Sequence, residues 1–388
     1  MTTRTHGAAV ALALGTAAVL AATLAACSPG GGPSRAPSPS PPASSAAPRP
    51  TGTSTPDPVL QPVQVTGEPI ELASGLDAPW SILRLANGAT LISERDTANV
   101  LELLSDGSTR VVGQVADVVP NGEGGLLGLA ALEDAASVWI YAYFTAADDN
   151  RIVRMPLSGA AGSLGLGAPE PVLGGIAKAG NHDGGRIAFG PDGMLYATAG
   201  DAGDGGRSQD PASLNGKILR MTPTGGVPDG NPFGTLVWSL GHRNPQGIAW
   251  DSRGRMWASE FGQNTWDELN LITPGSNYGW PVVEGAAGDP AFVDPVQQWA
   301  TTDASPSGLA IVSDTLFLAS LRGERLWTVW PDSGRAPAAA FEGAYGRIRD
   351  VVPGPDGTLW FITNNTDGRG DARDGDDRLL QVGLGPAS

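Results

Sequence analysis

Histidine is scarce in this sequence, and one of its few copies lies where acid/base chemistry could occur. The 388 residues include three histidines, of which His6 falls in a leader-like segment, leaving His182 and His242 in the mature chain. Asp201 ends the apolar run that follows His182. Because imidazole changes charge near neutral pH and can move a proton, His182 and Asp201 are the candidate acid/base pair. The alternatives are a histidine that completes the hydrogen bonds of a strand end, and an aspartate that belongs only to a turn.

Arginines recur near the beginnings of several repeated segments, together with a few other polar groups. Planar guanidinium groups form paired hydrogen bonds with carboxylates, so a cluster of arginines around one histidine indicates a polyanionic ligand. Each arginine taken singly could be a solvated surface charge, but recurrence at equivalent places favours a shared site. The candidate set is Glu123, His182, Arg243, Asn244, Arg322, Arg347 and Arg349.

A polar stretch at residues 262–272, followed by residues 277–281, could hold a metal ion. Its carboxylates stand beside amides and kinked backbone, and such hard oxygen ligands are those that calcium selects. A solvated acidic loop is the alternative interpretation of this stretch. A further acidic run, residues 367–377, has charges of alternating sign and lacks the regular spacing of a calcium repeat, so we expect a solvated loop there.

Composition excludes several other kinds of protein. The net charge is −16, and a phosphate backbone needs a basic surface, so we expect no nucleic-acid partner. One cysteine and two mature-chain histidines cannot form a usual structural zinc site. We find no G-x-S-x-G elbow, no Walker A run and no strand-linked G-x-G-x-x-G.

Six segments with one shared layout must position these side chains. Each has a small or polar entry, an apolar strand, a turn and a second strand, as in the hairpin expected over residues 186–199. Their spacing of roughly 40 to 60 residues suits four-stranded propeller blades. We therefore predict an all-β fold, a six-bladed β-propeller of four-stranded antiparallel blades, with the repeat entries meeting at one end of the central channel. The repeats begin near Pro79, Gly124, His182, Asn244, Pro306 and Arg347.

The two ends of the predicted propeller must pair to close the ring. An open ring would leave its first and last blades with bare strand edges. We therefore expect the segment at residues 70–72 to join the blade that contains residues 378–382.

The first sixty residues do not read as part of this fold. Residues 1–26 resemble a lipoprotein signal peptide, with cleavage expected before Cys27 and lipidation of its thiol. A retained transmembrane anchor is the alternative. Residues 27–60 are rich in Pro and Ser and are expected to be a disordered tether. The domain at residues 61–386 should then face outward, extracytoplasmic and held to the membrane only by its lipid.

Several motifs taken together resemble the soluble quinoprotein glucose/sorbosone dehydrogenase family, the aldose sugar dehydrogenases that depend on pyrroloquinoline quinone (PQQ). The resemblance covers the domain from about residue 72 to residue 382. GHRNPQG, and DELNLI followed by NYGWP, are its most specific parts. The matching motifs are HDGGR at 182–186, GDAG at 200–203, LNGKILR at 214–220, GHRNPQGIAW at 241–250, DELNLI at 267–272, NYGWP at 277–281 and RIRDV at 347–351.

This resemblance implies a reaction and a role for each matching residue. PQQ would lie over the channel mouth with calcium bridging it to the protein, and an aldose would be oxidised at its anomeric carbon to the lactone. His182 would be the general base, and Asp201 would orient the histidine and the sugar. The implied cofactor contacts are Glu123, Arg243, Asn244, Arg322, Arg347 and Arg349. The implied calcium ligands are the backbone carbonyls of Gly262 and Gln263, with Glu268 and Tyr278 at a second ion.

Three positions depart from the family pattern. Glu123 stands where a glutamine is usual, which would weaken binding of a polyanion unless the carboxylate is protonated or turned toward metal. Arg322 stands where lysine is common, which changes the geometry of the charge. Gln209 is the nearest candidate for a substrate-side glutamine. The electron acceptor is not indicated by the sequence, and the alternative functions are a metal-dependent lactonase and a non-catalytic surface-binding propeller.

Overall fold

The structure is a computed structural model that describes residues 60–387. The predicted signal peptide, the lipidation site at Cys27 and the linker up to residue 59 lie outside the described residues, so these remain predictions. Across residues 60–387, none of the helices combines the length and the apolar character needed to cross a bilayer.

Six antiparallel sheets make up the domain, and each contains four strands in a continuous path. We number the sheets as blades 1 to 6. Blade 1 consists of β2 (Pro79–Arg84), β3 (Thr90–Glu94), β4 (Asn99–Leu103) and β5 (Thr109–Gln114). Blade 2 consists of β6 (Leu126–Glu133), β7 (Val138–Thr145), β8 (Asn150–Ser158) and β10 (Glu170–Ile176), with β9 (Gly165–Leu166) added beside β8. Blade 3 consists of β11 (Ile187–Phe189), β12 (Leu195–Ala199), β13 (Lys217–Met221) and β14 (Val237–Leu240), with the short helix α1 (Gly206–Gln209) between β12 and β13.

The other three blades repeat this pattern and complete the ring. Blade 4 consists of β15 (Pro245–Trp250), β16 (Met256–Glu260), β17 (Trp266–Ile272) and β18 (Gln297–Ala300). Blade 5 consists of β19 (Pro306–Val312), β20 (Thr315–Ser320), β21 (Arg325–Val329) and β22 (Ala338–Ala340). Blade 6 consists of β23 (Ile348–Pro353), β24 (Thr358–Thr363, preceded by the 3-10 turn Pro355–Gly357), β25 (Leu379–Pro386) and β1 (Val63–Ala73).

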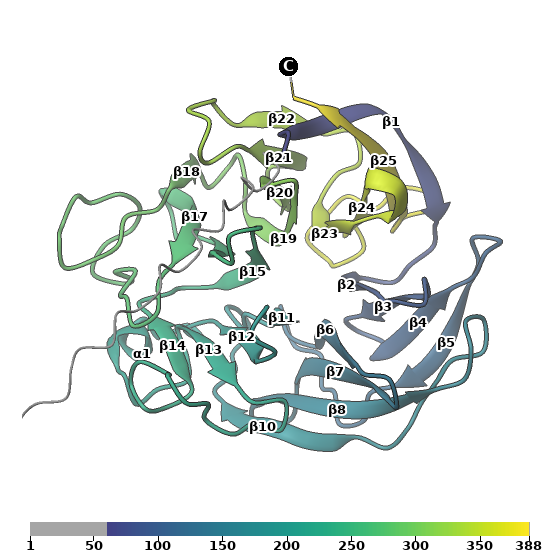
Figure 1. Cartoon of the computed structure of the whole chain (residues 1–388), viewed down its shortest axis with the longest axis horizontal. Helices are drawn as coiled ribbons and strands as arrows, with labels where there is room; N and C mark the ends of the chain where they lie inside the picture. The colour runs from purple at the N-terminus through teal and green to yellow at the C-terminus, as the bar shows by residue number, and fades with distance from the viewer. Residues whose placement is uncertain (1–59, 388) are drawn as a thin grey trace, which may run out of the picture. The chain divides into compact units, whose positions relative to one another are not determined.

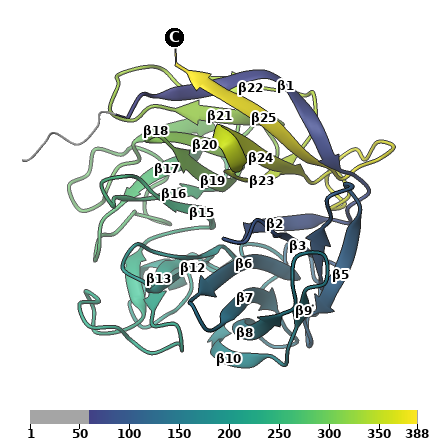
Figure 2. The same ribbon diagram turned by 45° about the vertical axis from the view of Figure 1, so that its right-hand side comes forward.

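The first strand of each repeat lies nearest the centre of the ring, as Figures 1 and 2 show for β2, β6, β11, β15, β19 and β23. These six strands begin within a few residues of the six predicted repeat entries. The six-bladed propeller predicted from the repeats is therefore confirmed.

The ring closes by pairing of the two ends of the domain. Strand β1 runs antiparallel to β25, with Ile70 opposite Gln381 and Glu71 opposite Leu380. Figure 1 shows the purple β1 beside the yellow β25. This confirms the predicted closure and gives β25 a partner on each side, because β24 pairs with its other edge.

The hairpin of β11 and β12 shows how a local turn sets the position of the candidate histidine. Asp192 in the turn accepts a hydrogen bond from the backbone N–H of Met194 (3.1 Å), and Gly193 has a φ of 73°, which favours glycine. Ile187 pairs with Ala197 in this hairpin. The apolar side chains of blade 3 then pack with those of blade 2 in one buried cluster. This packing anchors β11, the strand that follows His182.

A buried ion pair spans the central channel between blades 3 and 6. Arg186 Nη1 lies 3.0 Å from Asp350 Oδ2, and the guanidinium packs over the ring of Trp80 from blade 1 at 4.3 Å. Arg186 Nε also donates to the backbone carbonyl of Gln246 in blade 4 (2.9 Å). Four of the six blades are therefore linked by this one arginine at the axis.

Candidate active site

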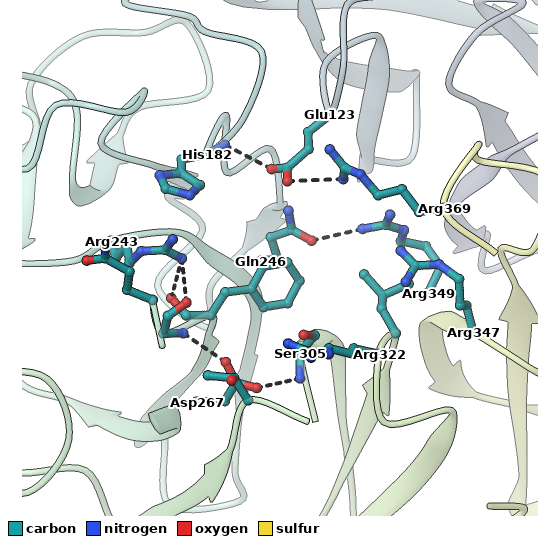
Figure 3. A pocket seen from close by; sticks show the side chains of 15 residues that line it. Glu123, His182, Arg243, Gln246, Asp267, Ser305, Arg322, Arg347, Arg349 and Arg369 are labelled. Atoms are coloured by element: carbon teal, nitrogen blue, oxygen red, sulfur yellow. Dashed lines mark hydrogen bonds and ion pairs between the residues drawn. The ribbon is translucent and has the colours of Figure 1, made fainter. Parts of the chain in front are cut away.

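A cavity of about 440 Å³ lies at one end of the channel, among the loops that enter the innermost strands. Figure 3 shows charged side chains from several blades facing into it. Five arginines and His182 line this cavity against only two carboxylates, although the protein as a whole has a net charge of −16. The charged and imidazole side chains of the lining are Glu123, His182, Arg243, Asp267, Arg322, Arg347, Arg349 and Arg369.

The imidazole of His182 is oriented by Asp201. Nδ1 of His182 lies 2.7 Å from Oδ1 of Asp201, and the indole N–H of Trp280 donates to Oδ2 of the same carboxylate at 2.8 Å. Burial alone would raise the pKa of Asp201, but hydrogen bonds and charge from His182, and the hydrogen bond from Trp280, lower it. An ionised Asp201 favours the tautomer with hydrogen on Nδ1, so Nε2 of His182 is the nitrogen that can accept a proton.

The backbone of His182 is held in an uncommon conformation. Its φ is 60°, and its N–H donates to Glu123 Oε2 at 2.8 Å. A Cβ atom at Gly200 would lie 2.0 Å from the carbonyl oxygen of His182, so only glycine permits this close approach. The loop before β11 and the end of β12 thus fix the backbone that carries the imidazole.

Arg243 enters the cavity from the loop before β15. Its backbone N–H donates to Glu260, and its Nη1 donates to the carbonyl of Gly262 at 2.5 Å. The guanidinium lies over the ring of Trp280 at 5.4 Å. Burial lowers the pKa of Arg243 against the raising effect of nearby carboxylates, and its Nε is buried without a partner among the described residues. This atom is a donor that a ligand could satisfy.

Arg347 and Arg349 share a buried counter-charge, Asp367. Arg347 Nη2 lies 3.0 Å and Arg349 Nη2 3.5 Å from Asp367 Oδ2, and Arg347 Nε is buried with no partner in residues 60–387. Asn364 Oδ1 accepts from two nitrogens of Arg349. The guanidinium of Arg349 therefore forms most of its hydrogen bonds with protein groups, whereas Nε of Arg347 remains as a donor for a ligand.

The acidic run that we expected to be a solvated loop is solvated only in its middle. Residues 368–375 are mostly exposed, but Asp367 and Asp377 at its two ends are buried. Asp377 accepts hydrogen bonds from Thr363, Asn365 and Thr366, so it ties the loop to the end of β24. The prediction was wrong for these two residues, because an acidic side chain can be buried when donors surround it.

Arg322 and Arg369 complete the cationic lining of the cavity. Arg322 is exposed, and no hydrogen bond or ion pair within residues 60–387 engages its guanidinium. Arg369, which the sequence analysis did not single out, donates from Nη1 to Glu123 Oε1 at 3.1 Å. Arg369 was missed in the sequence because it lies in the acidic run at residues 367–377, which has no periodic pattern.

The residues expected to bind metal lie in two neighbouring places. Gly262 and Gln263 line the cavity, and the backbone N–H groups of residues 263–266 all donate to Glu284 Oε1. Glu268 borders a small adjacent hollow together with Tyr278. Burial, with a contribution from the charge of Glu260, raises the pKa of Glu268 to about 7.

Two of the predicted residues act indirectly in the structure. Asn244 is buried and does not line the cavity; its Oδ1 accepts from the N–H of Gly184 at 3.0 Å, so it supports the His182 loop. Gln209 exchanges hydrogen bonds with Asn277 and donates to the carbonyl of Trp280 at 2.7 Å. Gln209 is thus engaged beside the Trp280 loop and is not part of the cavity wall.

The second histidine, His242, has a structural role outside the cavity. His242 is fully buried, with Nδ1 2.7 Å from Glu260 Oε2 and Nε2 2.8 Å from Ser239 Oγ. Glu260 also accepts from the backbone of Arg243. His242 therefore helps to place Arg243 and leaves His182 as the imidazole of the cavity.

Comparisons with known proteins show which proteins this chain is similar to. The PQQ-bound aldose sugar dehydrogenase of Streptomyces coelicolor is 51% identical to this chain, with a TM-score of 0.79 over 84% of this chain and 99% of that one. Aldose sugar dehydrogenase YliI of Escherichia coli is 29% identical over 76% of this chain and 90% of its own length. Quinoprotein glucose dehydrogenase B of Acinetobacter calcoaceticus is 31% identical over 57% of this chain and 54% of its own.

The family assignment rests on a longer match than any single motif. The sequence profile described as glucose/sorbosone dehydrogenase matches residues 76–374, which include all six blades in part or in full. This agrees with the family and with the oxidoreductase class that the motifs indicated. The chain therefore belongs to the glucose/sorbosone dehydrogenase family.

Proposed function

We propose that this protein oxidises an aldose at its anomeric carbon to the lactone, with PQQ as the redox cofactor and calcium as its metal. The observation that carries the proposal is the cavity in which five arginines surround one imidazole that is hydrogen-bonded to a carboxylate. The named relatives support it, because one is a PQQ-bound aldose sugar dehydrogenase and another a quinoprotein glucose dehydrogenase.

The cavity suits a tricarboxylate quinone. Arg243 and Arg347 each keep a buried Nε without a partner among the described residues, and Arg322 contributes an uncommitted guanidinium. These groups would bind the carboxylates of PQQ, since arginine forks match carboxylate geometry. Bound there with calcium, PQQ would supply the polarised quinone carbonyl that takes up hydride from the sugar.

Backbone and side-chain oxygens near the cavity suit calcium. The carbonyl of Gly262 accepts a hydrogen bond from Arg243 Nη1 at 2.5 Å, so calcium would take this oxygen in place of the guanidinium, because two cations on one carbonyl repel each other. The loop that carries Gln263 is held by Glu284, whose Oε1 accepts from the backbone N–H groups of residues 263–266. At the neighbouring place, Asn270 Oδ1 is buried without a partner among the described residues, beside Glu268. The phenol of Tyr278 is bonded to Leu271 and Thr273, so only its backbone carbonyl would serve as a ligand.

The protein's part in the chemistry is proton removal at a fixed atom. Asp201 holds hydrogen on Nδ1 of His182, so Nε2 would accept the proton of the anomeric hydroxyl and would then be stabilised as imidazolium by the same carboxylate. Trp280 restrains the second oxygen of Asp201 and so restricts rotation of the carboxylate. The catalytic residue is His182, and Asp201 and Trp280 position it.

We also propose that the enzyme works outside the cytoplasm, tethered by a lipid on Cys27. The support is the leader-like sequence of residues 1–26 with its single cysteine, followed by a Pro- and Ser-rich linker. Mass spectrometry of the membrane fraction would detect a diacylated Cys27. A mature chain that retains residues 1–26 would contradict this proposal.

The function can be tested with the purified full chain. Apo protein should bind PQQ, and with calcium present it should reduce an artificial electron-acceptor dye when aldoses are added. Because a bound ligand stabilises the folded state, PQQ and calcium together should raise the melting temperature, and a chelator should lower it again. PQQ binding without dye reduction by any aldose would favour a binding propeller, and absence of both would exclude the proposed function.

A further inference from the structure

Glu123 is the feature of the cavity that least fits an anion site. It is a carboxylate on the wall that would face the carboxylates of PQQ, and its side chain is only 17% exposed. An unpaired carboxylate there would repel the ligand, because like charges in a partly desolvated site disfavour each other. The contacts of Glu123 bear directly on this repulsion.

Both oxygens of Glu123 have separate tasks. Oε2 accepts the backbone N–H of His182 at 2.8 Å, and Oε1 accepts from Arg369 Nη1 at 3.1 Å. Figure 3 shows these two contacts meeting at the carboxylate, with Arg369 approaching from the side of Arg347 and Arg349. Glu123 therefore bridges the loop of the catalytic imidazole and the arginine cluster.

Arg369 is brought to this place by the same residue that holds the other arginines. The backbone N–H of Arg369 donates to Asp367 Oδ1 at 2.9 Å, while Asp367 Oδ2 binds Arg347. Gly370 packs against the side chain of Arg347, where an added Cβ would lie 2.8 Å from Arg347 Cδ. The loop between β24 and β25 thus presents Arg369 and positions Arg347 as one unit.

We propose that Glu123 and Arg369 form a compensated pair within the cofactor site, in which Glu123 fixes the His182 backbone and Arg369 cancels its charge so that a polycarboxylate can bind alongside. This inference rests on the proposed function. A glutamine could accept the same hydrogen bond from His182 without any charge. Arg369 therefore supplies the counter-charge that allows a glutamate to stand at this position beside a polycarboxylate.

The pair can be tested by a double-mutant cycle on PQQ binding to the full apo chain, measured by calorimetry. Arg369→Ala in the native background should weaken binding roughly tenfold, because it leaves Glu123 uncompensated. In the Glu123→Gln background, Arg369→Ala should weaken PQQ binding by about threefold or less, because residue 123 then carries no charge that needs a counter-charge. Arg373→Ala is the matched control: it removes a guanidinium from the same loop, and Arg373 bonds to backbone carbonyls at residues 343 and 344, away from the cavity.

The outcomes separate this inference from the proposed function. If Arg369→Ala weakens PQQ binding as much or more in the Glu123→Gln background as in the native one, Arg369 acts on the ligand directly. That result would overturn the proposed pair. No cost in the native background would overturn it as well, and both results leave PQQ binding by the unaltered chain intact. If the unaltered chain does not bind PQQ, the proposed function fails and the pair with it. Arg369 is 44% exposed at its side chain, and a melting curve of each variant checks that the fold is kept.

Discussion

The imidazole of His182 and the carboxylate of Asp201 meet at 2.7 Å across the mouth of the β11–β12 hairpin. His182 precedes the hairpin and Asp201 follows it, so two antiparallel strands return the chain to its starting edge. The second carboxylate oxygen is bonded to Trp280 from blade 4. Orientation of the His182 imidazole therefore depends on two blades, and a local motif alone would not provide it.

Replacing this pair should separate turnover from cofactor binding. We expect His182→Ala to bind PQQ nearly as tightly as the unaltered chain and to lose turnover by about 10²–10⁴-fold, the usual contribution of a general base. Asp201→Asn should lower turnover in the same direction, because an amide no longer holds hydrogen on Nδ1. Asp204→Asn is the control, since Asp204 lies on the same turn with its side chain 60% exposed. Steady-state dye reduction and PQQ titration measure both effects, and full turnover in His182→Ala would place the base elsewhere.

The fold was predictable because its signals are local and repeated. Each hairpin carries its own turn residues and alternating apolar strands, and six copies in sequence leave few architectures other than a propeller. The closure of β1 on β25 followed from the need to cover strand edges. The repeats did not indicate strand β9 or helix α1. Elements of two and four residues carry too little sequence pattern and depend on contacts made after folding.

The site was only partly predictable for a similar reason. His182 and Arg243 stand in recognisable motifs at repeat entries, and the structure brings both to the cavity. Asp367 and Arg369 lie in a loop with no periodicity. Asp367 acts through Arg347 and Arg349 at the start of β23, and Arg369 acts through Glu123, which is 246 residues away in the sequence. Side-chain partners across blades cannot be read from spacing along one chain.

Asp367 should be critical both for folding and for the cofactor. It is buried and faces Arg347 and Arg349, so Asp367→Asn leaves two buried cations without their counter-charge. Breaking a buried ion pair costs about 3–5 kcal/mol, and we expect a loss of this size in the free energy of unfolding, with weaker PQQ binding. Asp371→Asn, at an exposed position of the same loop, should change neither. Urea unfolding and titration of the two variants provide the comparison, and equal behaviour would remove the role given to Asp367.

The axial ion pair offers a test of stability apart from the cavity. Arg186→Met should lower the free energy of unfolding by about 3–5 kcal/mol, because it leaves Asp350 buried and uncompensated. The double variant Arg186→Met with Asp350→Asn should recover part of this loss, since the amide still accepts from the N–H of Ile82. Arg253→Met, in an exposed pair with Asp332, should change stability by less than about 1 kcal/mol. A double variant no more stable than Arg186→Met would show that the arginine acts through packing on Trp80 instead.

Asp183, the residue after His182, should make stability depend on pH. Burial raises its pKa from 3.8 to about 6, against the lowering effect of hydrogen bonds from Asn150 and Ala179. Its Oδ2 has no partner among the described residues, which suits the protonated acid. A folded-state pKa above the unfolded value means that the folded state binds the extra proton, so this contribution is complete below pH 3.8 and is lost as pH rises through about 6.

The shift of Asp183 corresponds to roughly 3 kcal/mol, since one pKa unit is worth about 1.4 kcal/mol. In Asp183→Asn the amide cannot ionise, so its free energy of unfolding should fall less between pH 4 and pH 7 than that of the unaltered chain. Asn150 would still donate to the remaining carbonyl oxygen, which limits other changes. Urea unfolding of both proteins across this range measures the difference in slope. Parallel pH profiles would mean that Asp183 remains ionised in the folded protein. The buried carboxylate beside His182 would then have to be stabilised by a donor that reaches Oδ2, such as an ordered water.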